Sequence, residues 1–250
     1  MKLKNRVAVV TGASRGIGRG IALAFAAQGA DIVFTYHSNK KAADETEDLI
    51  RKHGVKCLPV KCDASSESDV KALAETVRKE FGKLHILVNN AGTIGAEKPI
   101  TEITVEEWDH VLNTDLRGVF LNCKYLIPLI TRGNPVGKVI NISSELASKG
   151  RACYSPYTAA KGAVNTLTRS LALEYAPDLL VNAIAPGPIE TDMIMADMEP
   201  EWIEKEKDIP LRRLGKVEEI GAAALLLASD DGNFICGQVF GVNGGAVFIQ

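Results

Sequence analysis

Short runs of apolar and β-branched residues alternate with longer helical segments along almost the whole chain. Strands that are separated by a helix pair in parallel, because the helix carries the chain back across the sheet before the next strand begins. We therefore predict an α/β fold with a doubly wound parallel sheet and helices on both faces. The strands are expected at residues 7–11, 32–36, 56–61, 86–89, 138–142, 180–184 and 239–242.

The helical segments have recognisable starts and one unusual composition. Ser66 is followed three residues later by Asp69, and Thr104 by Glu107, as at capped helix starts. The segment 217–228 carries alanines and leucines on all sides, so it must be buried by the rest of the chain or by another subunit. The helices are expected at 17–28, 40–53, 66–81, 104–132, 157–175 and 217–228.

Length and composition set the general class of protein. A chain of 250 residues that is 46% hydrophobic is expected to form one domain, residues 1–250. The one long stretch without a pattern, 187–216, is interpreted as a lid over an active site rather than a domain boundary. The formal net charge of -2 offers no basic face for nucleic acid.

The same composition gives expectations about location and metals. No apolar run is long enough for a membrane span or a signal peptide. The five cysteines form no CxxC pair, and an odd number is typical of free thiols in a reducing compartment, so we expect a cytoplasmic protein. The four histidines show no metal-ligand spacing, and we predict no metal site.

A glycine-rich turn lies between the first predicted strand and the first predicted helix, where α/β sheets bind phosphate. Gly12 permits the tight turn, Gly16 lets the backbone approach a pyrophosphate, and Gly18 lets the helix pack on the sheet. The alternative is that the glycines merely end the strand. We predict a Rossmann-like dinucleotide site formed by Gly12, Ser14, Arg15, Gly16, Ile17 and Gly18.

The residue at the end of the second strand bears on the choice of cofactor. NAD-binding folds usually place an acidic residue about 20 positions beyond such glycines, where it holds the ribose hydroxyls. This chain has Tyr36 there, with Arg15, His37 and Lys40 near enough to attract a 2′-phosphate. We therefore predict that NADP(H) is preferred over NAD(H). The alternative is that these charges are ordinary solvated loop residues.

Tyr157 and Lys161 are four residues apart on a predicted helix and so share one face. An ordinary phenol has a pKa near 10, and a neighbouring ammonium favours its ionised form, which makes the pair suited to acid/base chemistry. A packed tyrosine beside a surface lysine is the alternative. Ser143 and Ser144 follow the strand 138–142, at the sheet edge where such folds bind ligands.

With these motifs in this order, the sequence resembles the short-chain dehydrogenase/reductase family over essentially its whole length. The resemblance implies that Ser144 polarises a substrate carbonyl, Tyr157 donates the proton and Lys161 binds the ribose. It further implies that Asn113 holds a water that relays protons. The motifs that carry it are residues 11–18, Asn89-Asn90-Ala91-Gly92, Asn113, Ser144, residues 157–161, and Pro186-Gly187 with Thr191.

The resemblance also implies contacts with the rest of the cofactor. Asp63 is expected at the adenine ring, and Ile189 and Thr191 at the carboxamide. The central part of the cofactor is expected to contact Asn90, Ala91 and Gly92, with Pro186 and Gly187 close by. Met193, Met195, Met198 and Trp202 are interpreted as an adaptable apolar cover for the substrate, with core packing as the alternative.

Several reactions and partners remain open within the resemblance. Residues 182–187 and 242–245 look like 3-oxoacyl-[acyl-carrier-protein] reductases, so reduction of a ketone or 3-oxoacyl group to a secondary alcohol leads. Tyr36-x-Ser38 and residues 173–177 look like glucose-type sugar dehydrogenases, the first alternative. A non-catalytic nucleotide-binding scaffold is the distant one. We expect a small carbonyl or alcohol substrate, little help from an acidic carrier protein, and a homo-oligomer, with a tetramer favoured.

Overall fold

The structure of the chain is a computed structural model, and it describes residues 1–191 and 200–248. Seven parallel strands form one sheet in the order β3-β2-β1-β4-β5-β6-β7. The order reverses between β1 and β4, and such a switch point opens a crevice beyond the carboxyl ends of the strands. The strands are β1 (Val7–Val10), β2 (Asp31–Tyr36), β3 (Cys57–Lys61), β4 (Ile86–Asn89), β5 (Gly137–Ile142), β6 (Leu179–Pro186) and β7 (Val239–Val242).

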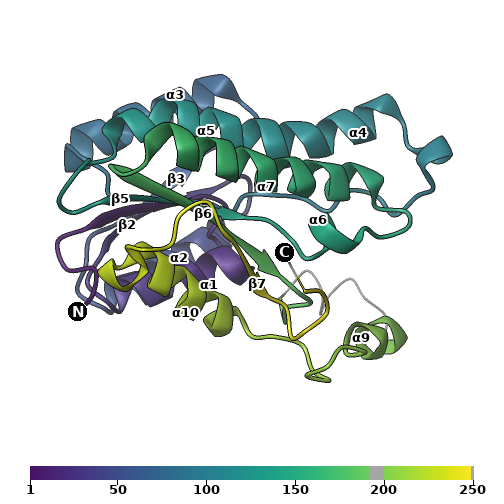
Figure 1. Cartoon of the computed structure of the whole chain (residues 1–250). Helices are drawn as coiled ribbons and strands as arrows, with labels where there is room; N and C mark the ends of the chain where they lie inside the picture. The colour runs from purple at the N-terminus through teal and green to yellow at the C-terminus, as the bar shows by residue number, and fades with distance from the viewer. Residues whose placement is uncertain (192–199, 249–250) are drawn as a thin grey trace.

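Helices cover both faces of the sheet (Figure 1). One face carries α1 (Gly16–Ala26), α2 (Lys40–Arg51) and α10 (Val217–Ala228), and the other carries α3 (Glu67–Phe81), α4 (Val105–Leu112), α5 (Gly118–Leu126) and α7 (Ser155–Tyr175). Two short helices, α6 (Leu146–Lys149) and α9 (Pro200–Glu206), lie at the end of the molecule toward which β6 and β7 point. The predicted doubly wound α/β fold is confirmed.

Each strand supplies two hydrophobic cores, because alternate side chains point to opposite faces of the sheet. In β1, Ala8 and Val10 pack in the core under α1 and α10, whereas Val7 and Val9 pack in the core under α3 and α5. The α1–α10 contact is close because it is made at glycines: a Cβ on Gly20 would lie 2.9 Å from Val217 Cβ. Burial of α10 within the monomer therefore accounts for much of its apolar composition, although Ala222 stays exposed.

The helix predicted over 104–132 is interrupted. Between α4 and α5 lies a π-helical turn, η2 (Asn113–Arg117), in which the Gly118 N–H donates to the carbonyl of Asn113 five residues earlier. The segment ends in a 3-10 turn, η3 (Ile127–Leu129), and shorter 3-10 turns occur at η1 (Ile100–Glu102) and η4 (Asp230–Gly232). A π turn within a helix is rare and is frequently found at a functional site.

Short helices form where no apolar period signals them. Helix α6 has four residues and α9 has seven, and each is too short to show a repeating apolar stripe. Within residues 1–191 and 200–248, none of the helices is long and apolar enough to cross a membrane.

Candidate functional site

The glycine-rich turn leads from β1 into α1 and is shaped for close approach. Gly12 has φ +63°, and a Cβ there would lie 2.8 Å from Ala91 Cα. A Cβ on Gly18 would lie 2.5 Å from Asn90 Nδ2, so only glycine fits between the two loops. Arg15, the N-cap residue of α1, makes no capping hydrogen bond through its side chain, which leaves the first amides of the helix to an anion.

The turn is held to the neighbouring strand by a polar network at the switch point. Thr11 Oγ1 accepts hydrogen bonds from the N–H groups of Asn90 and Ala91, at 2.9 and 3.0 Å. In return the Asn90 side chain donates to the carbonyls of Thr11 and Gly12. These bonds fix the ends of β1 and β4 relative to each other, so a phosphate bound at the turn would meet a rigid frame.

The residues predicted around the adenosine end lie at the carboxyl ends of β2 and β3. Tyr36 is the last residue of β2 and is half-buried, and His37 and Arg15 are exposed. The Nε2 of His37 lies 3.9 Å from Asp63 Oδ2. Burial opposes ionisation of Asp63, but two hydrogen bonds from Ser65 outweigh it and lower the pKa of the carboxyl.

Tyr157 and Lys161 lie in the first two turns of α7, next to the end of β5. The Lys161 side chain is 5% exposed, and its Nζ donates to the Ile142 carbonyl at 3.1 Å and lies 5.6 Å from the centre of the Tyr157 ring. Tyr157 itself is half-buried. The predicted pair therefore shares one face, with the ammonium beside the phenol ring.

The two serines after β5 have different surroundings. Ser143 Oγ donates to the Lys161 carbonyl at 3.2 Å and so links β5 to α7. Ser144 Oγ accepts the N–H of Leu146, which leaves its own proton for another acceptor. Ser144, the serine that the resemblance assigns to the substrate carbonyl, therefore keeps its hydroxyl proton for another acceptor.

Asparagines behind the serines hold the strand ends in register. Asn89 Nδ2 donates to Asn141 Oδ1 at 2.8 Å, and Asn141 Nδ2 donates to Thr168 Oγ1 at 2.9 Å. All three side chains are buried, so this ladder joins β4, β5 and α7 without contact with solvent. It positions the helix that carries Tyr157 relative to the sheet.

Asn113, to which the resemblance assigns a proton-relaying water, is the first residue of the π turn. Asn113 is exposed on η2, whereas Asp115 is fully buried and its Oδ2 lies 3.0 Å from Lys161 Nζ. A signal for Asp115 was present in the sequence: it lies four residues after Val111 and four before Val119, both buried, on one helical face. A carboxylate on an apolar stripe needs a buried partner.

The opposite wall of the site is formed where β6 meets the end of β7. Pro186 ends β6, and a Cβ on Gly187 would lie 2.7 Å from Asn243 Cα. Ile189 is buried and Thr191 is half-buried. Thr191 lies close to the glycine-rich turn, since a Cβ on Gly16 would be 3.6 Å from Thr191 Cγ2. The structure thus brings Thr191 to the glycine-rich turn.

Helix α9, in the segment predicted as a lid, is tied to the loop before α7. Arg151 forms an ion pair with Glu206 at 2.6 Å, and its guanidinium lies over the rings of Tyr154 and Trp202. Tyr154 donates to Glu97 at 2.7 Å, and burial together with that carboxylate raises its pKa to about 12. Met193, Met195 and Met198 lie outside the described residues.

The residues present at the switch point fit a dinucleotide. The glycine cradle, the free amides of α1 and the Thr11–Asn90 network together suit a pyrophosphate. Among the described residues, histidine, cysteine and acidic side chains form no group of three that could hold a metal ion.

The sequence matches known proteins along nearly its whole length. Residues 12–247 match a family model described as enoyl-(acyl carrier protein) reductase. A short-chain type dehydrogenase/reductase of Picea abies is 41% identical, over 98% of this chain and 93% of the relative. Glucose 1-dehydrogenase 2 of Bacillus subtilis is 37% identical, over 97% and 95%. A 3-oxoacyl-[acyl-carrier-protein] reductase of Staphylococcus epidermidis is 36% identical, over 96% and 98%.

Solved structures share the fold in full. A short-chain dehydrogenase from Burkholderia cenocepacia in complex with NADP has a TM-score of 0.92 and 30% identity, covering 98% of this chain and 99% of that one. A blue fluorescent protein from a metagenomic library in complex with NADPH has a TM-score of 0.92 and 33% identity, covering 99% and 100%. Both were solved with a nicotinamide cofactor.

Proposed function

Since the chain belongs to the short-chain dehydrogenase/reductase family, we propose that it is an NADP(H)-dependent oxidoreductase that reduces a ketone or 3-oxoacyl group to a secondary alcohol. The observation that carries the proposal is the group at the end of β5: Lys161 sits charged and buried beside Tyr157, next to a serine with a free hydroxyl proton. This arrangement suits proton transfer to a carbonyl oxygen.

Each side chain of the group has a separate task. Ser144 donates a hydrogen bond to the substrate carbonyl and holds it in place. Tyr157 gives its phenolic proton to the carbonyl oxygen as that oxygen gains negative charge. Lys161 stabilises the resulting phenolate by its positive charge, at 5.6 Å from the ring centre.

The nicotinamide cofactor is to be held by the predicted residues at the carboxyl edge of the sheet. The amides of α1 and the turn at Gly12, Gly16 and Gly18 would hold its phosphates, Lys161 would bind its ribose, and Ile189 and Thr191 would contact its carboxamide. When bound, the cofactor supplies the hydride for the carbonyl carbon.

Preference for NADP(H) is supported by the end of β2. Tyr36 offers no carboxylate to repel a 2′-phosphate, and none of the ion pairs between described residues involves Arg15. We expect Tyr36→Asp to shift the ratio of kcat/KM for NADPH and NADH by about tenfold or more toward NADH, since like charges repel. A wild-type enzyme that favours NADH would contradict the proposal.

The substrate is expected to be a free ketone or ketoester rather than a carrier-bound acyl chain. An acidic carrier protein needs an exposed basic surface. Of the two basic residues nearest the corresponding places, Lys138 is buried and Arg132 is exposed over the Tyr175 ring, while Asp178 is exposed with the wrong charge. We expect similar kcat/KM for a 3-oxoacyl chain on carrier protein and on a short thioester. A carrier advantage of about a hundredfold that disappears with salt would restore a role in fatty-acid synthesis.

Glucose-type sugar oxidation is the alternative, since a glucose dehydrogenase is a relative of similar identity. The deciding experiment follows NADPH consumption with a panel of ketones, diketones and 3-oxoacyl thioesters, and NADP reduction with sugars. Turnover of ketones alone supports the proposal, and turnover of sugars alone supports the alternative. A failure of hydride transfer with every member would favour a nucleotide-binding scaffold.

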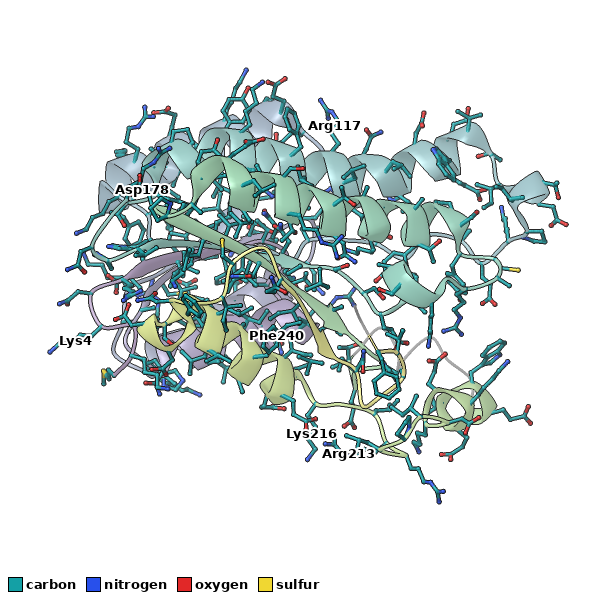
Figure 2. The ribbon with its side chains drawn as sticks, in the orientation of Figure 1. Lys4, Arg117, Asp178, Arg213, Lys216 and Phe240 are labelled. Carbon is teal, nitrogen blue, oxygen red and sulfur yellow. The ribbon has the colours of Figure 1, made fainter. Side chains whose placement is uncertain are left out.

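A homo-oligomer, with a tetramer favoured, is supported by apolar side chains beside the last strand. Phe234 is fully exposed, and Phe240 lies on β7 at the edge of the sheet, 36% exposed (Figure 2). Exposed aromatic side chains at a sheet edge commonly mark a subunit contact. Light scattering after size-exclusion chromatography tests this, and a monomer at micromolar concentration would contradict it.

A further inference from the structure

Asp115 is a fully buried carboxylate that no predicted role explains. It lies in the π turn η2, where the helix between α4 and α5 is re-aimed, and its side chain points toward α7. A buried carboxylate destabilises the folded state unless it is paired and hydrogen-bonded, so the contacts of Asp115 with its neighbours decide what it does.

Both oxygens of Asp115 are engaged. Its Oδ1 accepts the N–H of Thr93 at 2.7 Å, and its Oδ2 lies 3.0 Å from Lys161 Nζ. A Cβ on Gly92 would lie 2.8 Å from Asp115 Oδ2 and 3.3 Å from Lys161 Nζ. The loop after β4 therefore packs directly on the ion pair, and any side chain at Gly92 would push the pair apart.

Asp115 opposes the effect of burial on Lys161. Burial disfavours the ammonium, but the charge of Asp115, followed by that of Tyr157 and the hydrogen bond to Asp115, raises the pKa of Lys161 overall. Other acidic groups near this region are paired elsewhere, Glu145 with Lys149 and Glu107 with Lys98. Among the described residues, Asp115 is the carboxylate in ion-pair contact with Lys161.

We propose that Asp115 is a positioning residue whose carboxylate keeps the Lys161 ammonium protonated and seated beside Tyr157 into the alkaline range. The proposal rests on the proposed function, because the charge of Lys161 serves catalysis only if Tyr157 is the proton donor. Without the carboxylate, burial is opposed less strongly, and the proton of Lys161 is lost at lower pH.

The direct test is a ¹³C titration of protein labelled at the lysine ε carbon, with Lys161→Met assigning the signal. Asp115→Asn removes the charge while its Oδ1 can still accept the Thr93 N–H. The midpoint for Lys161 is expected to fall by roughly 1–3 pH units in this variant. Equal midpoints in wild type and Asp115→Asn would overturn the proposal.

A second test uses the reaction itself. The alkaline limb of kcat/KM for ketone reduction is expected to move to lower pH in Asp115→Asn and to stay near that of wild type in Asp115→Glu, which keeps the charge. A merely structural role would lower kcat/KM by the same factor at every pH, and that result would overturn the proposal.

The two tests separate the proposal from the function on which it rests. If no ketone is reduced, the proposed function fails, and the ¹³C titration still decides whether Asp115 holds the proton on Lys161. If Asp115→Asn does not fold, Asp115→Ser offers a smaller neutral side chain with the same expected shift.

Discussion

Two buried lysines lie at opposite ends of β5, and they differ in the direction of their pKa shifts. Lys138, near the start of the strand, is 1% exposed, and burial, aided by Arg6, lowers its pKa to about 8. Lys161 reaches the last residue of the strand, and its pKa is raised. Burial penalises both ammonium groups, so the difference comes from their partners.

The partner of each lysine explains the difference. Lys138 Nζ donates a hydrogen bond to the uncharged side-chain amide oxygen of Asn233 at 2.6 Å. The nearby Asp230 carboxylate forms its ion pair with Arg6 instead. Lys161 Nζ lies 3.0 Å from the Asp115 carboxylate, which forms no ion pair with another described residue. Depth alone therefore does not set the charge of a buried lysine, and a carboxylate within ion-pair distance does. The ammonium is kept charged at the end of the strand where the chemistry is proposed.

The largest expected effect is on turnover, when the proposed proton donor beside Lys161 is replaced. Tyr157→Phe keeps the ring and removes only the proton, so turnover should fall by at least about 10² to 10⁴-fold with the fold intact. Steady-state rates, with cofactor binding measured by fluorescence, check this. Ser144→Ala should also be severe and Ser143→Ala mild. If Tyr157→Phe were as active as wild type, Tyr157 would not be the proton donor, and Lys161 would not act by stabilising its phenolate.

A large change in stability is expected when Lys161 is replaced. Lys161→Met leaves Asp115 buried without its partner and should lower the free energy of unfolding by about 3–5 kcal/mol, measured by urea at pH 7. Lys138→Met is the matched control, since Asn233 is exposed and water can replace the lost donor. Its effect should stay within about 1 kcal/mol. Equal losses in the two variants would show that the lysines do not differ as the contacts indicate.

A smaller effect concerns pH at the amino end of the sheet, where His85 is 2% exposed and accepts the Val7 N–H through Nδ1. Burial, with Lys83 and Arg6 nearby, lowers its pKa from 6.5 to about 4. Between these values the unfolded chain binds the proton and the folded chain does not, so stability falls as pH falls. The loss should reach about 3 kcal/mol by pH 4.

Urea unfolding at pH 7 and pH 4.5 measures this loss. His85→Asn, which keeps an acceptor for the Val7 N–H and cannot be protonated, should show a smaller difference between the two pH values. An equal acid loss in wild type and variant would assign the sensitivity to other groups, such as the carboxylates that pair in the folded state.

The fold could be predicted because its signals are local. The strands β4 and β7 have the expected bounds, and the other strands differ by a few residues at their ends. Glycines at the turn and capped helix starts such as Thr104 with Glu107 lie within a few residues of what they determine. Alternation of strand and helix then leaves few topologies open.

The site could be predicted only where its geometry follows a regular period. Tyr157 and Lys161 share a face because a helix repeats every 3.6 residues. The π turn η2 was not predicted, because it lies between two helices that the sequence joins into one. The ion pair of Asp115 joins residues 46 positions apart. The apolar face shared with Val111 and Val119 indicates that Asp115 is buried, but which residue pairs with it is a property of packing that no local pattern specifies.

The close approach of Gly187 to Asn243 has a practical consequence for handling the protein. Residues 243–248 follow β7, and Asn243 packs against Gly187 in the wall of the candidate site. The Gly244 carbonyl accepts a hydrogen bond from the Leu211 N–H of the predicted lid. Lys4 lies at the other end of the molecule from Arg213 and Lys216 (Figure 2). An affinity tag or surface attachment is therefore better placed before Met1, because at that end of the molecule the added group lies away from the candidate site.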